Sequence, residues 1–167
     1  MLFLFTTPLP IAPPVVITPG YLDPNELIAY IRAYNVANGD PWRDAGFAAD
    51  LAYVEANDRI IDPAVFVVPG PESSRDISDM KVIRQIITCS VRIVTVVRHY
   101  RIDSGESAHN TISPLRLLVR NHVIGFRPSG FDNSLRHAGA NLRSFTDELQ
   151  VWVDEFSADF HFQKYIN

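Results

Sequence analysis

Five histidines, one cysteine and two adjacent carboxylates are the residues of this chain that could take part in chemistry. The histidines are His99, His109, His122, His137 and His161. None of them stands in an HxH, HExxH or CxxC spacing, which would place two metal ligands on one helix face or in one turn. The sequence therefore predicts no metal site and no cofactor.

Asp154 and Glu155, together with His161, could in principle serve as an acid and a base. Residues 154 and 161 have opposite parity on an extended strand, so their side chains point to opposite faces. We therefore expect the carboxylates to be solvated or ion-paired. Cys89 is a poor nucleophile, because it lies in a strand and not at a helix N-terminus.

The chain also lacks the loops that nucleophilic or nucleotide chemistry uses. There is no GxSxG, no GxxxxGK[ST] and no GxGxxG segment. Arg84, Arg92 and Arg98 beside Tyr100 form a basic strand face, but single-strand nucleic-acid binding needs several exposed aromatic residues. The net charge of −4 also argues against a broad basic surface. We expect no catalysis, and a small hydrolase or a nucleic-acid-binding module is the alternative from another class.

These basic residues lie on one long predicted strand, KVIRQIITCSVRIVTVVRHYR at residues 81–101. One parity is apolar: Ile83, Ile87, Cys89, Val91, Ile93 and Val97. The other parity is polar and cationic: Arg84, Thr88, Ser90, Arg92 and Arg98. Fully extended, the run would span roughly 65 Å, whereas a domain of this size is only ~30–40 Å across. Part of the strand should therefore bend, bulge or project beyond its own domain.

Helices are expected on both sides of this strand. Asp23 is a suitable N-cap for DPNELIAYIRAYN, with Pro24 at the first helical position and Glu26 at the capping-box position. Its buried stripe comprises Leu27, Ile28, Ile31 and Tyr34. A short helix is plausible at 50–56. The later helix begins either near Ser107 or with Ser113 as its cap, and it ends at Gly125 before a turn at 127–130. Its stripe comprises Ile112, Leu115, Val119 and Val123 or His122.

Shorter strands complete the pattern. Residues 64–68 form an apolar strand, residues 69–79 a long mobile loop, and residues 134–166 a hairpin or meander. Asp154 interrupts the apolar parity of the last strand, which indicates either a bulge or a paired carboxylate. The paired carboxylate is favoured, because an unpaired buried charge is costly. The fold class is α+β: a mixed or antiparallel sheet of about four strands, one very long, packed against two to three helices.

Bulk composition predicts one domain. A 167-residue chain that is 47% hydrophobic can form a real core. We assign residues 23–167 to this domain, with a loop at 69–80, and residues 1–22 to an extended, proline-bearing arm. The arm is too short and lacks the basic region expected of a membrane anchor or signal peptide. Cys89 is the single cysteine, so no disulfide forms within the chain and a reducing compartment is indicated.

The two halves of the chain carry opposite charge. Residues 1–80 hold eleven acidic and four basic side chains (4 − 11 = −7), and residues 81–167 hold eight and eleven (11 − 8 = +3). Such asymmetry can orient the copies of a self-associating protein, although ordinary solvated faces would also produce it.

The order of segments from Pro63 to Asn167 resembles the phage tail terminator proteins. PAVFVVP, a polar loop, a strand ending VVRHYR, the segment PLRLLVRNHVIGFRP and the closing LQVWVDEFSADFHFQ carry this resemblance. It implies a structural protein, without catalytic residues or cofactor, that is assembled in the host cytoplasm and forms a hexameric ring on the head-proximal end of the tail tube. The ring would stop tail polymerisation and join the tail to the head. Another neck or head-completion protein, or a tail tube protein, is the alternative.

The resemblance also implies partners: other copies of the chain, the tail tube protein and head-tail connector or neck proteins. No membrane is implied and no direct nucleic-acid recognition, while the lumen of the ring leaves room for DNA to pass. We predict that charged residues lie at the subunit interface: Arg84, Arg92 and Arg98 on the strand, Asp76 and Asp79 on the loop, and Asp154 or Glu155 as their partners.

Overall fold

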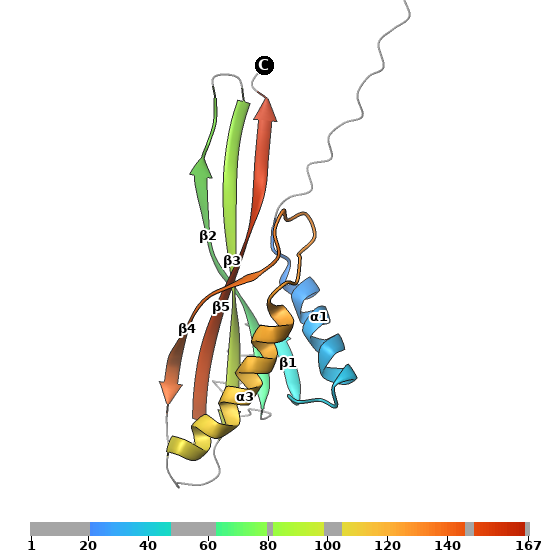
Figure 1. Cartoon of the computed structure of the whole chain (residues 1–167), viewed down its shortest axis with the longest axis vertical. Coiled ribbons are helices and arrows are strands. Elements are labelled where there is room, and N and C mark those ends of the chain that lie inside the picture. Colours follow the sequence, from blue (N-terminus) through green and yellow to red (C-terminus); the bar gives the residue numbers. More distant parts are fainter. Residues whose placement is uncertain (1–20, 48–62, 80–81, 99–104, 146–148, 166–167) are drawn as a thin grey trace, which may run out of the picture.

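A computed structural model describes residues 21–47, 63–79, 82–98, 105–145 and 149–165. In chain order the elements are α1 (Pro24–Ala37), β1 (Asp44–Phe47), β2 (Ala64–Asp76), β3 (Val82–Arg98), α3 (Gly105–Val123), β4 (Arg136–Phe145) and β5 (Leu149–Tyr165). The strands form one sheet in the order β1-β2-β3-β5-β4 (Figure 1). The predicted α+β class is confirmed, and β1 adds a strand to the expected four. The helix expected at 50–56 lies outside the described residues.

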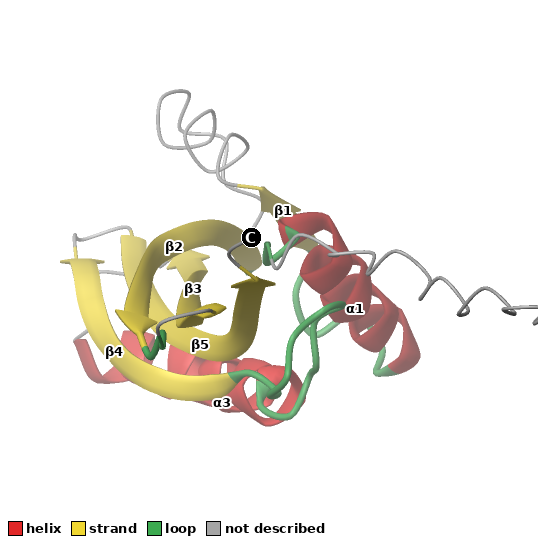
Figure 2. Ribbon diagram, turned by 90° about the horizontal axis from the view of Figure 1, so that it is seen from above, coloured by secondary structure: helices red, strands yellow, loops and turns green. Residues whose placement is uncertain are grey.

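The centre of the sheet is the pair of long strands. β3 pairs antiparallel with β5 without interruption from Val82 opposite Tyr165 to Arg98 opposite Leu149. β2 and β4 flank this pair, also antiparallel, and β1 runs parallel to β2. Both helices lie on one side of the sheet, and this arrangement is visible both from the front (Figure 1) and from above (Figure 2). The hairpin or meander predicted for 134–166 corresponds to β4 and β5, which pair antiparallel with each other.

The main core lies between the helices and this face of the sheet. It contains the predicted apolar parity of β3, in which Val91 and Ile93 are fully buried. Facing them are Leu27, Ile28 and Ile31 of α1, Val119 and Val123 of α3, and Phe156, Ala158 and Phe160 of β5. These positions recur at helical spacing in the helices and at every second residue in the strands, so each element buries one stripe.

The opposite face of the sheet is less cationic than predicted. Val94 and Val96 share a parity with Arg92, yet both are buried in a second apolar cluster. Its other members are Ala64, Phe66, Val151 and Val153. The lower half of the sheet is therefore buried on both faces, and the cationic character of β3 is confined to its remaining positions.

The upper part of the sheet extends past both helices in Figure 1. We call this part the ribbon: residues 72–76 of β2, 82–89 of β3 and 158–165 of β5. Its three strands are hydrogen-bonded in register as far as Asp76, Val82 and Tyr165. Of the three predicted alternatives, in which part of the long strand bends, bulges or projects beyond its domain, the structure shows projection.

The prediction of a long mobile loop at residues 69–79, or 69–80 within the domain, is wrong for residues 69–76. β2 continues to Asp76, with a register shift between Pro69 and Glu72. Because β1 pairs with β2 only up to Val67, no described strand pairs with the outer edge of β2 beyond that point, and an edge strand tolerates prolines, which have no N–H to donate. Near the end of this strand pair, the N–H of Ile77 donates to the carbonyl of Arg84 at 2.9 Å.

The first helix is as predicted except at Glu26. Asp23 is the N-cap, and its Oδ1 accepts from the N–H of Asn25 at 2.9 Å. Glu26 does not complete a capping box in the described contacts. Its carboxylate accepts from the N–H and hydroxyl of Ser129, at 3.1 and 2.9 Å, and so ties α1 to the turn after α3.

The later helix begins earlier than its second predicted start. It runs from Gly105 with Pro114 inside it, which decides against Ser113 as the cap. Ile112, Val119 and Val123 are fully buried, as the stripe predicted. Gly125 follows the helix with a positive φ of 91°, a conformation that favours glycine at a helix end.

Gly70 is expected to be essential for the bulge in β2. A Cβ at this position would lie 2.8 Å from the carbonyl oxygen of Ser90, closer than real contacts allow. Gly70→Ala should lower the free energy of unfolding by about 1–3 kcal/mol because backbone must shift. Gly139→Ala is the matched control, since its Cβ would meet nothing within 4 Å. Urea denaturation measures both, and equal stability of the two variants would contradict this account.

Candidate assembly surface

A buried carboxylate holds α3 against the sheet beneath the candidate surface. The side chain of Asp154 is fully buried on β5. Its Oδ2 accepts from Nε of Arg116 at 2.9 Å, and its Oδ1 from Nη2 of Arg116 at 3.1 Å and from Nε of Arg120 at 2.6 Å. Nε2 of His137 on β4 lies 3.1 Å from the same Oδ1. Three elements are thereby joined through one side chain.

The electrostatics of this centre favour the charged carboxylate. Burial by itself would raise the pKa of Asp154, but hydrogen bonds and charge from Arg116, with hydrogen bonds from Arg120 and His137, outweigh burial and hold the pKa below its usual range. The guanidinium of Arg116 also lies 3.7 Å from the ring centre of Trp152, a cation–π contact. The prediction of a paired carboxylate at position 154 is confirmed.

This burial argues against Asp154 as an interface residue. A carboxylate with no exposed surface and three partners in its own chain cannot offer an oxygen to a neighbouring subunit in this conformation. We therefore correct the interface prediction for Asp154 and retain Glu155, whose side chain is partly exposed. The sequence analysis missed Arg116, Arg120 and His137. The two arginines are four residues apart on a helix, so both lie on one face. This spacing could have predicted that they share one partner.

Among the remaining predicted interface residues, Arg84, Arg92 and Arg98 are spread along the strand face that the helices do not cover, whereas Asp76 lies opposite Gln85 and so shares the other face. Arg84 pairs with Asp79 near the tip of the ribbon at 3.6 Å, both about half exposed. Arg92 pairs with Glu155 midway along the sheet at 3.8 Å. Asp76 accepts from the N–H and hydroxyl of Ser78, and these hydrogen bonds lower its pKa. The structure therefore brings together two oppositely charged pairs and does not gather the set into one site.

Arg98 lies at the other end of β3, fourteen residues from Arg84 (98 − 84 = 14), roughly 46 Å along an extended strand. A surface that includes all three arginines would run the length of the sheet. Whether neighbouring subunits cover this surface remains a prediction.

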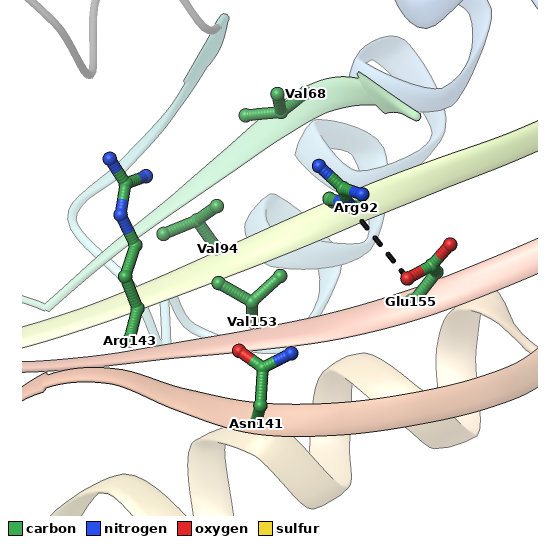
Figure 3. Close-up of a pocket in the computed structure, with 7 residues that line it drawn as sticks. All are labelled: Val68, Arg92, Val94, Asn141, Arg143, Val153 and Glu155. Carbon is green, nitrogen blue, oxygen red and sulfur yellow. Dashed lines mark ion pairs between the residues drawn. The ribbon is translucent and has the colours of Figure 1, made fainter. Parts of the chain in front are cut away.

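An open hollow of about 370 Å³ lies midway along this face (Figure 3). Val68, Val94 and Val153 form its apolar floor. Its polar rim consists of Arg92, Asn141, Arg143 and Glu155. These side chains come from β2, β3, β4 and β5, and Figure 3 shows them on the same side of the strands. The hollow is defined by this floor and rim.

The described residues show no arrangement suited to catalysis at a metal. No group of three or more His, Cys, Asp or Glu side chains within them could hold a metal ion. His161, which the sequence analysis separated from Asp154, instead contacts Asp132 through Nδ1 at 2.7 Å. Burial, with the neighbouring Glu72, raises the pKa of Cys89 to about 12, so its thiol stays protonated at neutral pH. Neither described helix is long and apolar enough to cross a membrane.

Comparison with known proteins defines the class. A family model described as "Phage tail terminator protein" matches residues 17–167, nearly the whole chain. The chain therefore belongs to the phage tail terminator family, and it is a structural protein of the virion tail. This confirms the resemblance derived from residues 63–167 and extends it toward the N-terminus.

Among curated proteins none matches. Among solved structures, a chain from a structure titled "Virion of native gene transfer agent (GTA) particle" is 15% identical, with 62% of this chain and 73% of that chain covered and a TM-score of 0.34.

Asp154 provides a test of this account. Asp154→Asn should cost about 3–5 kcal/mol at pH 7, because it leaves Arg116 and Arg120 without their buried counter-ion. A carboxylate whose pKa is lowered by folding contributes stability above its unfolded pKa of about 3.9 and loses it as pH falls through the folded value. The gap between wild type and variant should therefore narrow in acid.

Asp132→Asn is the matched control. This carboxylate is half exposed and pairs with His161, so its removal should cost at most about 1 kcal/mol. Urea denaturation at several pH values measures both variants. Equal losses at pH 7 would contradict the structural importance of Asp154.

Proposed function

We propose that this protein caps the head-proximal end of a phage tail tube as a closed ring of identical subunits, six in number by resemblance to its family. The ring stops polymerisation of the tube and presents the surface to which the head joins. The observation that carries this proposal is the family match over residues 17–167. No catalysis is included, because the family consists of structural virion proteins.

The ribbon supports self-association. β1 pairs with β2 only from Ala64 to Val67, and β4 pairs with β5 no further than Ser157. Beyond these points neither edge of the ribbon has a strand partner among the described residues. Open strand edges pair readily with other chains, and head-to-tail contacts of unlike surfaces form a ring when the rotation between successive copies closes.

The two edges of the ribbon differ, as a head-to-tail contact requires. Directly before the ribbon, Pro69 and Pro71 interrupt the edge of β2, because they lack an N–H. On the edge of β5, two backbone groups are already hydrogen-bonded to Asp132. The carboxylate of Asp132 accepts from the N–H of His161 at 2.6 Å, and its own N–H donates to the carbonyl of Asp159 at 3.1 Å. Residues 162–165 lie beyond this block and offer the more accessible edge.

Virions that lack this protein provide the direct test. Electron microscopy should show abnormally long tails, or finished tails that are not attached to heads. A tube subunit would instead leave no tails, and the purified protein would polymerise into open stacks and not closed rings. Normal infectious particles without the protein would rule out the proposed function.

A charge reversal tests Arg92 as an interface residue. Arg92→Glu should leave stability within about 1 kcal/mol of wild type, since its pair with Glu155 is partly exposed and long. If Arg92 faces an acidic group of a neighbouring subunit, the variant should weaken association by about tenfold or more, because like charges would meet. Analytical ultracentrifugation measures the association.

The swapped double variant Arg92→Glu with Glu155→Arg is the control. It restores the pair within the subunit but leaves the charge at position 92 reversed. Association that remains weak supports a contact with a neighbour, whereas full recovery would show that Arg92 serves only its own chain.

A further inference from the structure

The segment that precedes the family match has an unusual chemical character. Residues 1–16, MLFLFTTPLPIAPPVV, contain no charged side chain, and four of them are proline. Proline contributes a backbone carbonyl but no N–H, so this segment is richer in acceptors than in donors. Proline-rich chains also favour an extended helix without internal hydrogen bonds. A surface that binds this segment should therefore combine an apolar floor with hydrogen-bond donors.

The hollow has these two properties. Its floor of Val68, Val94 and Val153 suits the leucine, phenylalanine and isoleucine side chains of the segment. On its β4 side, the amide of Asn141 and the guanidinium of Arg143 are exposed and together carry several N–H donors. The charges of Arg92 and Glu155 are already paired with each other, so an occupant without charged side chains leaves this pair intact. The volume of about 370 Å³ lies in the range of ~300–1,000 Å³ typical of binding pockets.

The position of the chain at Leu22 favours the hollow of another copy over the chain's own. Leu22 is buried in the core on the helix-covered face, and its backbone hydrogen-bonds to the thiol of Cys89. The hollow opens on the opposite face, because Arg92 and Val94 have the other parity on β3. Sixteen residues of extended proline-type helix span roughly 50 Å at ~3.1 Å per residue, enough to reach an adjacent subunit.

We propose that residues 1–16 of one copy bind in the hollow of a second copy, with their apolar side chains on the valine floor and their carbonyls accepting from Asn141 and Arg143. Each subunit then donates one segment and receives one. This proposal rests on the self-association in the proposed function but not on tail termination, and it concerns residues outside the family match.

Disulfide trapping between two full-length preparations tests this exchange. One preparation carries Leu4→Cys and the other Asn141→Cys, each with its own affinity tag, so that a mixed disulfide can form only between copies. The native Cys89 interferes little, because it is buried and its pKa of about 12 keeps it protonated. The expected result is a mixed disulfide that forms about tenfold faster than with the control, since binding raises the local concentration of the thiol.

Arg136→Cys paired with Leu4→Cys is the control. Arg136 lies on the same strand and has an exposed side chain, paired with Asp159 and outside the hollow. Equal rates for positions 136 and 141 would overturn the proposal. An internal disulfide in a dilute chain that carries both Leu4→Cys and Asn141→Cys would overturn it as well, because the segment would then fill its own hollow. Arg143→Cys replaces Asn141→Cys if that variant fails to fold.

Light scattering on the same samples separates this inference from the proposed function. Rings of normal mass without the mixed disulfide would overturn the exchange and leave the ring proposal standing. Failure of the wild-type chain to assemble under any condition would count against both.

Discussion

The uninterrupted pairing of β3 with β5 is the constraint on which the rest of this structure depends. Their ladder extends from Val82 opposite Tyr165 to Arg98 opposite Leu149, which is longer than the helices can cover. The lower half of the ladder is buried on both faces, and the upper half becomes the ribbon. A single long β-pair thus supplies both the core of the subunit and the part that extends away from it.

The helices are held to this ladder by two kinds of contact. Apolar stripes of α1 and α3 pack on Val91, Ile93 and Phe156, and this packing is tolerant of small shifts. The contact of Arg116 and Arg120 with Asp154 is directional, because a guanidinium fork fits a carboxylate in few orientations. The buried carboxylate therefore sets the angle of α3 across β5, while the apolar contacts provide most of the burial.

The face of the sheet without helices carries exposed charged residues of the strands. It carries the pairs Arg84–Asp79 and Arg92–Glu155 and the hollow between the strands. Because these pairs are exposed and long, they contribute little to folding and remain available to other charges. Within the tail structure that the family assignment indicates, this exposed face is the candidate surface for assembly.

The sequence by itself determined the elements whose signals are local. Asp23 and Pro24 mark the start of α1, Gly125 marks the end of α3, and alternation along β3 and β5 reveals which residues face the core. Family membership also followed from the order of segments. The tertiary structure alone decided features that depend on distant residues: the continuation of β2 through its prolines, the burial of Val94 and Val96, and the partners of Asp154. Local patterns report the preferences of neighbouring residues in the chain, whereas an edge strand, a second core and a buried ion pair arise only when segments far apart in sequence meet.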